Sequence, residues 1–354
     1  MPLPADAALA DWLRERTGQR LSRRAPVGGG SIHAAWRLEL EGGELLFAKS
    51  CSLADQSLLV AEADGLAALA AAVAASSPAA CSLSLSSPSL SSPSLSTPAV
   101  SSASLSSASL STPAATGSPL RVPQPLALGV VADQAVLLLP WLEIRSDAEP
   151  AAWRHFGAAL AALHRASLGR ALGDGDRPEG FHGWWRDNVI GSTPQTNDWC
   201  PDWGRFFSER RLAPQLELLA RRGGALAGAA ELLERVPRWL ACHDPEPVLV
   251  HGDLWSGNGA LLRGGGAAIF DPAVYRGDRE VDLAMAHLFG GFPAAFFAGY
   301  EEAWPLPAGH RRRLDLYNLY HLLNHANLFG GGYRNRSQAL IRELLADPPI
   351  ALAH

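Results

Sequence analysis

The sequence predicts an α+β fold of two lobes, in which a small lobe with an antiparallel sheet precedes a larger, mainly helical lobe. Strand-like segments dominate up to about residue 144, whereas helical periodicity dominates from about residue 151. The 354 residues are enough chain for two structural units. A short strand-loop-strand segment interrupts the helical part near residues 249–272. We place the boundary at residue 140, which gives lobes of 1–140 and 141–354.

Two helices and four strands are expected in the small lobe. The strands alternate apolar and polar residues, and the helices repeat apolar residues at three- and four-residue spacing. The first two strands form a hairpin about Gly42 and Gly43. In chain order we expect a helix at 4–17, strands at 36–40 and 44–49, a helix at 57–74, and strands at 125–131 and 135–144.

The segment between the second helix and the third strand has the composition of a disordered insertion. From Ser84 to Pro113 it repeats with a five-residue period (SLSSP, SLSSP, SLSTP, AVSSA, SLSSA, SLSTP), and half of it is serine. With almost no charge and no aromatic residue, it buries too little surface to offset the entropy of ordering. Recurrent proline argues against a β-solenoid. We expect residues 76–119 to be a disordered Ser-, Pro- and Ala-rich insertion.

The charge of the whole chain gives no reason to expect nucleic acid or a membrane as a partner. The net charge is −5 and the isoelectric point is about 6.1, so no basic field attracts polyanions. The four cysteines are widely spaced without a C-x-x-C pair, which argues against a zinc site or a disulfide framework. We see no signal-type N-terminus and no run of about 18 apolar residues. We therefore expect a soluble cytoplasmic protein, whose oligomeric state the sequence leaves open.

Three glycines and a serine precede the first strand of the hairpin. Gly28, Gly29 and Gly30 allow the backbone to approach a phosphate closely, with its N–H groups as donors, and Ser31 follows them. A triple glycine is more often a flexible turn. The segment therefore favours nucleotide binding only together with other features.

Lys49 and Glu62 are charged residues on faces that are otherwise apolar. Lys49 ends a strand and shares a face with Leu45 and Phe47, and Glu62 lies in the apolar stripe of the helix at 57–74. We expect these two residues to form an ion pair that holds the ammonium at the α- and β-phosphates of ATP. The alternatives are a strand-end lysine that reaches water and a glutamate at the edge of the stripe.

Asp253, Asn258 and Asp271 follow a pattern that suits phosphoryl transfer. The stretch HGDLWSGN at residues 251–258 has the D-x-x-x-x-N spacing of a kinase catalytic loop, with Gly252 where protein kinases carry Arg. Phosphoryl transfer needs a carboxylate that accepts the proton of the attacking hydroxyl, a role that we expect for Asp253. Asn258, and Asp271 at the end of the next apolar run, supply the hard oxygen ligands that Mg²⁺ prefers.

Longer stretches identify the family that the chain resembles. They are HGDLWSGN, DPAVYRGDREVDLAMAHLFGGF, IGSTPQTNDWCPDWGRFF and LYHLLNHANLFGGGY. With them the chain is similar to the fructosamine kinases, also called ketosamine 3-kinases, which are relatives of aminoglycoside and choline kinases with a protein-kinase-like fold. The resemblance covers nearly the whole chain except the Ser-rich insertion. Other small-molecule kinases share only the HGD, Asn and Asp skeleton.

The resemblance implies an ATP- and Mg²⁺-dependent kinase. Its implied substrate is a small-molecule or protein-bound ketosamine of the fructosamine or ribulosamine type, phosphorylated at the 3-hydroxyl, and the implied outcome is deglycation. The alternatives are a kinase for another amine-bearing small molecule, of the aminoglycoside or choline type, and a pseudokinase scaffold that binds nucleotide without turnover. The pseudokinase is disfavoured because Lys49, Asp253, Asn258 and Asp271 are all present.

By the same resemblance each site residue has an implied role. Asp253 is the catalytic base, and Asn258 and Asp271 are Mg²⁺ ligands. Nucleotide contacts are implied for the phosphate loop, the ion pair and the hinge between the lobes: Gly28, Gly29, Gly30, Ser31, Lys49, Glu62, Leu139, Trp141 and Leu142.

Two positions depart from the family pattern. Ser31 stands where many relatives have cysteine, so thiol-based control of that loop is not expected here. Pro140 stands where many relatives have an acidic residue, and because proline has no N–H, the hinge offers adenine one backbone donor fewer.

Three residues are expected on the acceptor side. Trp255, two residues after Asp253, is well placed to stack on an acceptor. His321 and Asn324 share one face of a predicted helix, and they either line the acceptor pocket or are buried, hydrogen-bonded core groups.

Four further polar residues near the motif are expected to be structural. We expect Asp278 and Glu280 to cap a helix and pair with arginine rather than bind metal. The resemblance implies that Asp282 supports the backbone of the catalytic loop. His251 should brace that loop through hydrogen bonds rather than form a metal site.

The Ser-rich insertion should be dispensable for catalysis. Because each doubling of a flexible loop costs only about 0.6 kcal/mol, replacing residues 76–119 with a short Gly-Ser linker should leave kcat and the KM for ATP within about twofold. The measurement is steady-state kinetics with one small and one protein-bound ketosamine. A tenfold fall in kcat/KM for either substrate would instead indicate a lid over the acceptor.

Overall fold

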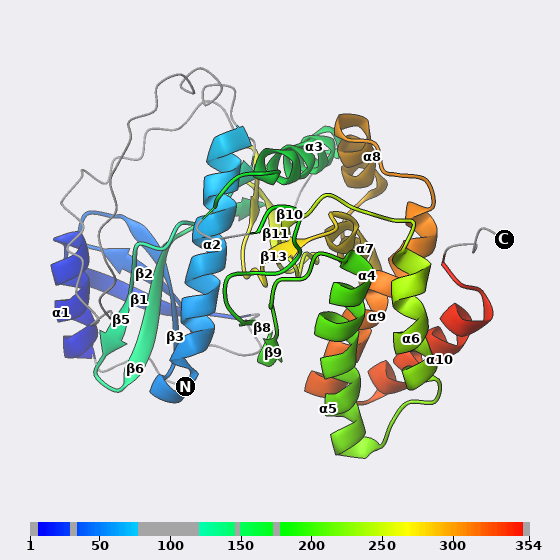
Figure 1. Ribbon diagram of the computed structural model, residues 1–354. Helices are drawn as coiled ribbons and strands as arrows, with labels where there is room; N and C mark the ends of the chain where they lie inside the picture. Colours follow the sequence, from blue (N-terminus) through cyan, green and yellow to red (C-terminus); the bar gives the residue numbers. More distant parts are fainter. Residues whose placement is uncertain (1–5, 29–33, 77–119, 146–148, 173–177, 350–354) are drawn as a thin grey trace, which may run out of the picture.

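The computed structural model describes residues 6–28, 34–76, 120–145, 149–172 and 178–349. An antiparallel sheet in the N-terminal part lies beside a mainly helical C-terminal part (Figure 1). This arrangement confirms the predicted α+β fold with a small sheet-containing region first. Gly29, Gly30 and Ser31 fall outside the described residues, as does the predicted insertion after Ser76.

The N-terminal sheet has five strands in the order β1-β2-β3-β6-β5, and all neighbours are antiparallel. Helix α1 covers one face, where its Leu9 and Leu13 pack against Leu46 of β3. Helix α2 covers the other face, so the two helices lie on opposite sides of the sheet (Figure 1). The elements are α1 (Asp6–Thr17), β1 (Leu21–Val27), β2 (Ala34–Leu40), β3 (Leu45–Ser52), α2 (Gln56–Ser76), β5 (Ala127–Val131) and β6 (Gln134–Pro140).

The edge strand β1 and the strand predicted over 135–144 both differ from the sequence prediction. The edge strand β1 was not predicted, because LSRRAPV exposes most of its side chains and includes a proline, which an edge strand tolerates. The single strand predicted over 135–144 is divided: β6 ends at Pro140, and β7 (Ile144–Arg145) pairs with β11 in another sheet. The chain therefore leaves the N-terminal sheet at Trp141.

Helix α2 is apolar enough to pass for a membrane span. By length and composition the helical segment Leu53–Ser76 is the one candidate among the described residues, and half of its apolar window is buried inside the fold. The helix contacts β3, β6 and α3, and its buried positions include Leu59, Glu62 and Leu66. Its composition is therefore that of a helix between two packed layers.

The segment with the predicted catalytic motif forms small strands at the centre of the molecule. The predicted order of strand, loop, strand, glycine turn and strand is confirmed as β10 (Val248–Val250), β11 (Gly259–Leu262) and β12 (Ala267–Ile269). Strand β10 pairs with β13 (Tyr275–Gly277). Strands β11 and β12 lie in a sheet ordered β4-β12-β11-β7, in which β4 (Leu120–Arg121) runs parallel to β12.

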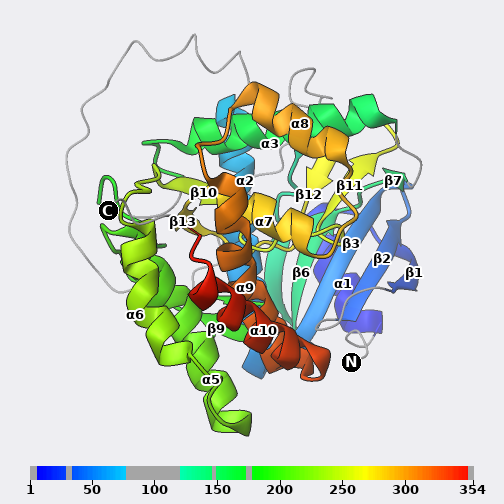
Figure 2. The same cartoon turned by 90° about the vertical axis from the view of Figure 1, so that its right-hand side faces the viewer.

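Helices surround these strands, with α9 in the middle of the C-terminal part (Figure 2). A π-helical turn (Phe207–Leu212) joins two of them, and β8 (Asn188–Ile190) and β9 (Thr193–Gln195) form a separate hairpin. The helices are α3 (Pro150–Ser167), α4 (Trp203–Phe206), α5 (Ala213–Gly223), α6 (Ala229–Leu240), α7 (Glu280–Leu288), α8 (Ala294–Ala303), α9 (His310–Phe329) and α10 (Gly332–Ala346).

Two glycines let α3 and α8 cross with their backbones in contact. A Cβ added to Gly157 would lie 1.9 Å from the carbonyl oxygen of Phe296, and one added to Gly299 would lie 2.0 Å from that of Arg154. No side chain fits at such distances. This crossing matters for the site because α3 carries His164 and α8 carries Tyr300, which form a hydrogen bond.

We predict that Gly157→Ala destabilises the protein by about 1–3 kcal/mol, because the added methyl group must separate the two helix backbones. The measurement is urea unfolding followed by circular dichroism. Gly264→Ala is the matched control, since a Cβ at Gly264 meets open space. Equal free energies of unfolding for the two variants would contradict the crossing.

Candidate active site

A buried carboxylate holds the loop that carries the predicted base. Asp282 of α7 is fully buried and accepts hydrogen bonds from the backbone N–H of His251 (2.7 Å) and of Gly252 (2.8 Å), and it contacts Nε2 of His164 (3.1 Å). Burial alone raises the pKa of Asp282, but these partners, His164 first, hold it below the ordinary value. The prediction that Asp282 supports the catalytic-loop backbone is confirmed.

Gly252 is required by the path of this loop. Its φ is +81°, and a Cβ there would lie 2.0 Å from the carbonyl oxygen of Ala273. The segment after β12 is therefore packed against the loop, and the backbone N–H of Ala273 donates to the His251 carbonyl (2.8 Å). An arginine at this position, as in protein kinases, would not fit this backbone.

His251 braces the loop as predicted. Its Nε2 donates to the carbonyl of Phe270 (2.9 Å), and its Nδ1 accepts from the backbone N–H of Asp253 (3.3 Å). Burial lowers the pKa of His251, so the ring stays neutral and serves both bonds. The imidazole thereby ties the catalytic loop to the end of β12.

Asp253 and Asn258 face each other across the loop. The amide nitrogen of Asn258 donates to the carbonyl oxygen of Asp253 (2.9 Å) and to its Oδ2 (3.2 Å). The Asp253 side chain is 20% exposed. Burial, together with the charge of Asp271, raises the pKa of Asp253 to about 7. A carboxyl group with such a pKa exchanges a proton readily near neutral pH.

One ammonium group joins the N-terminal sheet to the catalytic region. Nζ of Lys49 on β3 lies 2.8 Å from Oε1 of Glu62 on α2, which confirms the predicted ion pair, and it also contacts Oδ1 of Asp271. Burial favours neutral Lys49, but the two carboxylates outweigh it and raise its pKa. Burial raises the pKa of Glu62 to about 7, whereas Lys49 holds that of Asp271 below its ordinary value despite burial. A single cation is thus shared by two carboxylates.

Asp271 has an uncommon backbone conformation. Its φ is +57°, in the left-handed region that residues with a Cβ rarely adopt, and Pro272 follows. Its side chain is 45% exposed, in contrast to 9% for Lys49 and for Glu62. The strained turn therefore presents a carboxylate that reaches both the buried lysine and the solvent.

The donor set here suits a hard divalent cation. Asp271 offers carboxylate oxygens, and Asn258 offers an amide oxygen because its nitrogen is used by Asp253. Asn258 directly precedes β11 and Asp271 comes just after its partner strand β12, so the two residues lie at the same end of this strand pair, where the amide nitrogen of Asn258 also lies 3.4 Å from the carbonyl oxygen of Asp271. Mg²⁺ binds such oxygens through one or two carboxylates and completes its shell with water and phosphate. The residues present therefore fit the cation.

The described part of the predicted nucleotide side lies along β3 and β6. Leu139 is buried in the layer between the sheet and α2, and Trp141 contacts Phe47 and donates its backbone N–H to Leu45 (3.2 Å). Leu142 is half-buried and Gly28 is exposed at the end of β1. Because the N–H of Trp141 is used within the sheet and Pro140 has none, Leu142 is the next backbone donor along the hinge.

The three predicted acceptor residues differ in their exposure and in their hydrogen bonds. Trp255 is 38% exposed, and its ring covers Gly257, where an added Cβ would lie 2.3 Å from the indole. Asn324 is buried and accepts from Nε2 of Gln215 (3.3 Å), as a core group does. His321 is equally buried, and its Nδ1 lies 3.9 Å from Oδ1 of Asp253.

Sequence reasoning missed the polar network behind the site. The hydroxyl of Tyr320 donates to Gln195 (2.7 Å), and Gln195 donates to the carbonyl of Ala273 (3.2 Å), so α9 and β9 support the segment after Asp271. Arg211 is fully buried and lies over the Tyr275 ring at 3.9 Å from its centroid. Nothing in the sequence around Arg211 or Gln195 indicates that either side chain is buried and supports the site.

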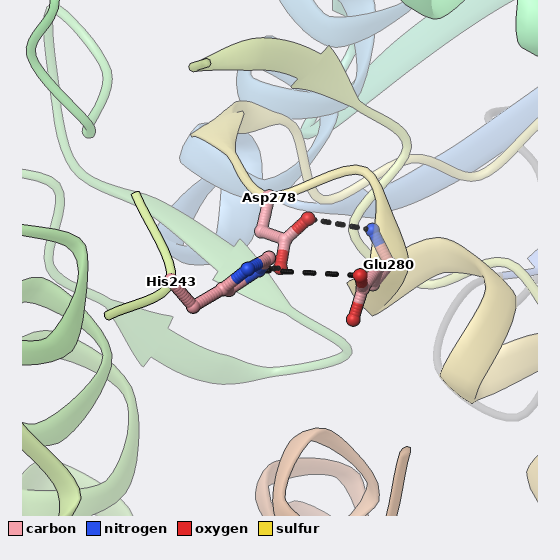
Figure 3. A group of neighbouring side chains, drawn as sticks. All are labelled: His243, Asp278 and Glu280. Carbon is pink, nitrogen blue, oxygen red and sulfur yellow. Dashed lines mark hydrogen bonds and ion pairs between the residues drawn. The ribbon is translucent and has the colours of Figure 1, made fainter. Parts of the chain in front are cut away.

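A second group of metal-ligand types lies at the start of α7 but is already paired. His243, Asp278 and Glu280 bring their side-chain ligand atoms within 4.8 Å of one another (Figure 3). Asp278 accepts from the N–H of Glu280 (3.0 Å), from Tyr317 (2.6 Å) and from His243 (2.7 Å), while Arg313 holds both oxygens of Glu280. The predicted arginine pairing is confirmed for Glu280, whereas Asp278 pairs with His243 and Tyr317 instead. The N-cap residue of α7 is Arg279 and has no side-chain cap bond, so the predicted capping is not found as such.

Comparisons with known proteins identify the family. A family model described as fructosamine kinase matches residues 107–347. The probable ketoamine kinase of Synechocystis is 38% identical over 350 residues, which cover 98% of this chain and 99% of that protein. The chloroplastic protein-ribulosamine 3-kinase of rice is 37% identical over 233 residues, 64% of each chain.

Two solved structures are also similar to this chain. The putative fructosamine-3-kinase from Thermobifida fusca is 30% identical and superposes with a TM-score of 0.70, covering 96% of this chain and 98% of that one. An aminoglycoside phosphotransferase at 18% identity has a TM-score of 0.54 over 94% of this chain and 98% of its own, which shows the shared kinase-like fold. The chain therefore belongs to the fructosamine kinase family.

Proposed function

We propose that this protein transfers the γ-phosphate of ATP to the 3-hydroxyl of a ketosamine, a sugar joined to an amine as a 1-amino-1-deoxyketose. The observation that carries the proposal is the convergence of Lys49, Glu62 and Asp271 beside Asp253 and Asn258, which come from β3, α2 and the loops around β11 and β12. The membership in a kinase family and the ribulosamine 3-kinase relative support the choice of acceptor.

In this proposal the residues of the chain position the reactants. Asp253 orients the acceptor hydroxyl and takes its proton as the oxygen bonds to the γ-phosphorus and the bond to the bridging oxygen of ADP breaks. Lys49, held by Glu62, contacts the α- and β-phosphates. Asn258 and Asp271 would hold Mg²⁺, which supplies neutralisation of the phosphate charge when it is bound.

The product explains why such a phosphorylation leads to deglycation. Loss of a proton from C1 converts the ketosamine to an enaminol, and the phosphate at C3 then leaves with the bonding electron pair. Water adds to the resulting imine and releases the amine. The kinase therefore needs only to place a good leaving group at C3.

The acceptor class is tested by ADP release from a panel of amines. The panel contains fructose, ribulose and erythrulose adducts of one amine, the same adducts on protein lysines, and an aminoglycoside and choline. We expect turnover with at least one ketosamine and none with the last two. Turnover with choline or the aminoglycoside alone would support the alternative amine kinase, and binding of ATP without any turnover would support a pseudokinase.

We predict that Asp253→Asn lowers kcat by about 10²-fold or more, because loss of a general base typically costs 10²- to 10⁴-fold. The fold and ATP binding should be retained, as the amide has the shape of the carboxyl group. The measurements are steady-state kinetics and calorimetry with ATP, with the exposed Asp315→Asn on α9 as the control. Near-normal turnover of the Asp253 variant would remove this residue from the proposed role.

We predict that Asp271→Ala weakens the binding of Mg·ATP more than that of metal-free ATP. The variant loses a metal ligand, but it also frees Lys49 from one of its two carboxylates. Calorimetric titrations with ATP, in Mg²⁺ and in EDTA, measure the two affinities. Asp133→Ala, in the exposed turn between β5 and β6, is the control. Equal losses in the two titrations would count against metal ligation.

A further inference from the structure

His321 is a buried polar side chain whose ring nitrogen Nδ1 has no hydrogen-bond partner among the described residues. It is 3% exposed, and within the part of the chain that the structure describes its Nδ1 bonds to nothing. Leaving such a group unpaired in the interior is costly, so an orphaned buried nitrogen calls for an explanation. The explanation lies in what faces it.

The neighbours of His321 have partners of their own. Tyr320 donates to Gln195, Asn324 accepts from Gln215, and Nδ1 of His325 bonds to the carbonyl oxygen of His321 (2.9 Å). On the other side, Nδ1 of His321 faces Oδ1 of Asp253 at 3.9 Å. This distance is too long for a hydrogen bond, so the two atoms lie near each other without being bonded.

The ring is a neutral donor. Burial, reinforced by His325, lowers the pKa of His321 to about 3, so no proton is gained near neutrality. A neutral imidazole carries its one hydrogen on either nitrogen. When Asp253 is ionised, as a base must be, the negative potential of its carboxylate favours the hydrogen on Nδ1, because an N–H is attracted to that oxygen and a lone pair is repelled.

We propose that His321 is a specificity-determining residue, whose Nδ1–H donates to the C2 oxygen of the ketosamine while Asp253 receives the proton of the adjacent 3-hydroxyl. Hydrogen bonds of about 2.8 Å from two protein atoms this close reach oxygens on neighbouring carbons. In the open-chain ketose the C2 oxygen is a carbonyl, which only accepts. The pair thus reads the vicinal oxygens of a ketosamine, and the inference rests on the proposed function.

The assignment separates His321 from a merely structural histidine. A structural role predicts that substitution lowers turnover of all acceptors alike, through a disturbed loop or helix. A donor to the C2 oxygen predicts instead that the substitution matters only when the acceptor has that oxygen. The comparison therefore needs two acceptors that differ at C2 alone.

The test is a cycle of two enzymes and two acceptors, read as kcat/KM by ADP release. The acceptors are the best ketosamine of the panel and its 2-deoxy analogue, with CH₂ at C2. Wild type should prefer the ketosamine by about tenfold or more, since an unpaired buried donor penalises the analogue. His321→Phe, which keeps a ring but no donor, should turn over the two acceptors within about threefold of each other, and His321→Gln should restore part of the preference.

His325→Phe is the matched control, since it makes the same change one helical turn away, and it should retain the wild-type preference. A preference that survives in full in His321→Phe overturns the inference while leaving the kinase function intact. If His321→Phe does not fold, as judged by circular dichroism, loss of the preference in His321→Leu, which also has no donor, replaces it. No turnover of any ketosamine by wild type would overturn the proposed function and this inference together.

Discussion

The buried carboxylate of Asp282 is the interaction on which the arrangement of the site depends. A charge without exposure is stable only when donors surround it, and here two of the donors are the backbone N–H groups of the catalytic loop itself. The third partner, His164, is fixed in turn by Tyr300. Helix α7 carries Asp282, the catalytic loop supplies its two backbone donors, and the crossing of α3 and α8 holds His164 in place. These three parts of the structure are therefore coupled through one carboxylate.

Lys49 provides a second constraint, between the N-terminal sheet and the catalytic region. Its ammonium is nearly enclosed by β3, α2 and the turn at Asp271, and two carboxylates share it. With Asp253 close by, the negative charge at this point exceeds the positive charge that the protein supplies. Such a surplus is unfavourable for folding alone, and a divalent cation, as in the proposed function, would relieve it at a site that combines strain at Asp271 with like charges.

The features that the sequence predicted are those in which the signal is local. Asp253 and Asn258 stand in one loop, Glu62 interrupts the apolar stripe of a single helix, and Lys49 interrupts one strand face, so spacing alone indicated them. The Asp282–His164 and Tyr320–Gln195 pairs join residues 118 and 125 positions apart, and neither partner is unusual in its own segment. The edge strand β1 was missed because an exposed strand lacks apolar alternation. The roles assigned to the nucleotide and acceptor residues stay predictions.

The two ends of the Ser-rich segment are attached to the same body. Helix α2 ends at Ser76 and β4 begins at Leu120, and both elements pack against α3, with β4 also paired to β12. Each end is therefore held by contacts of its own within the described part of the chain. Between two ends fixed in this way, a change in the length of a flexible connection costs little, so evolution could add or remove five-residue repeats at such a junction one at a time.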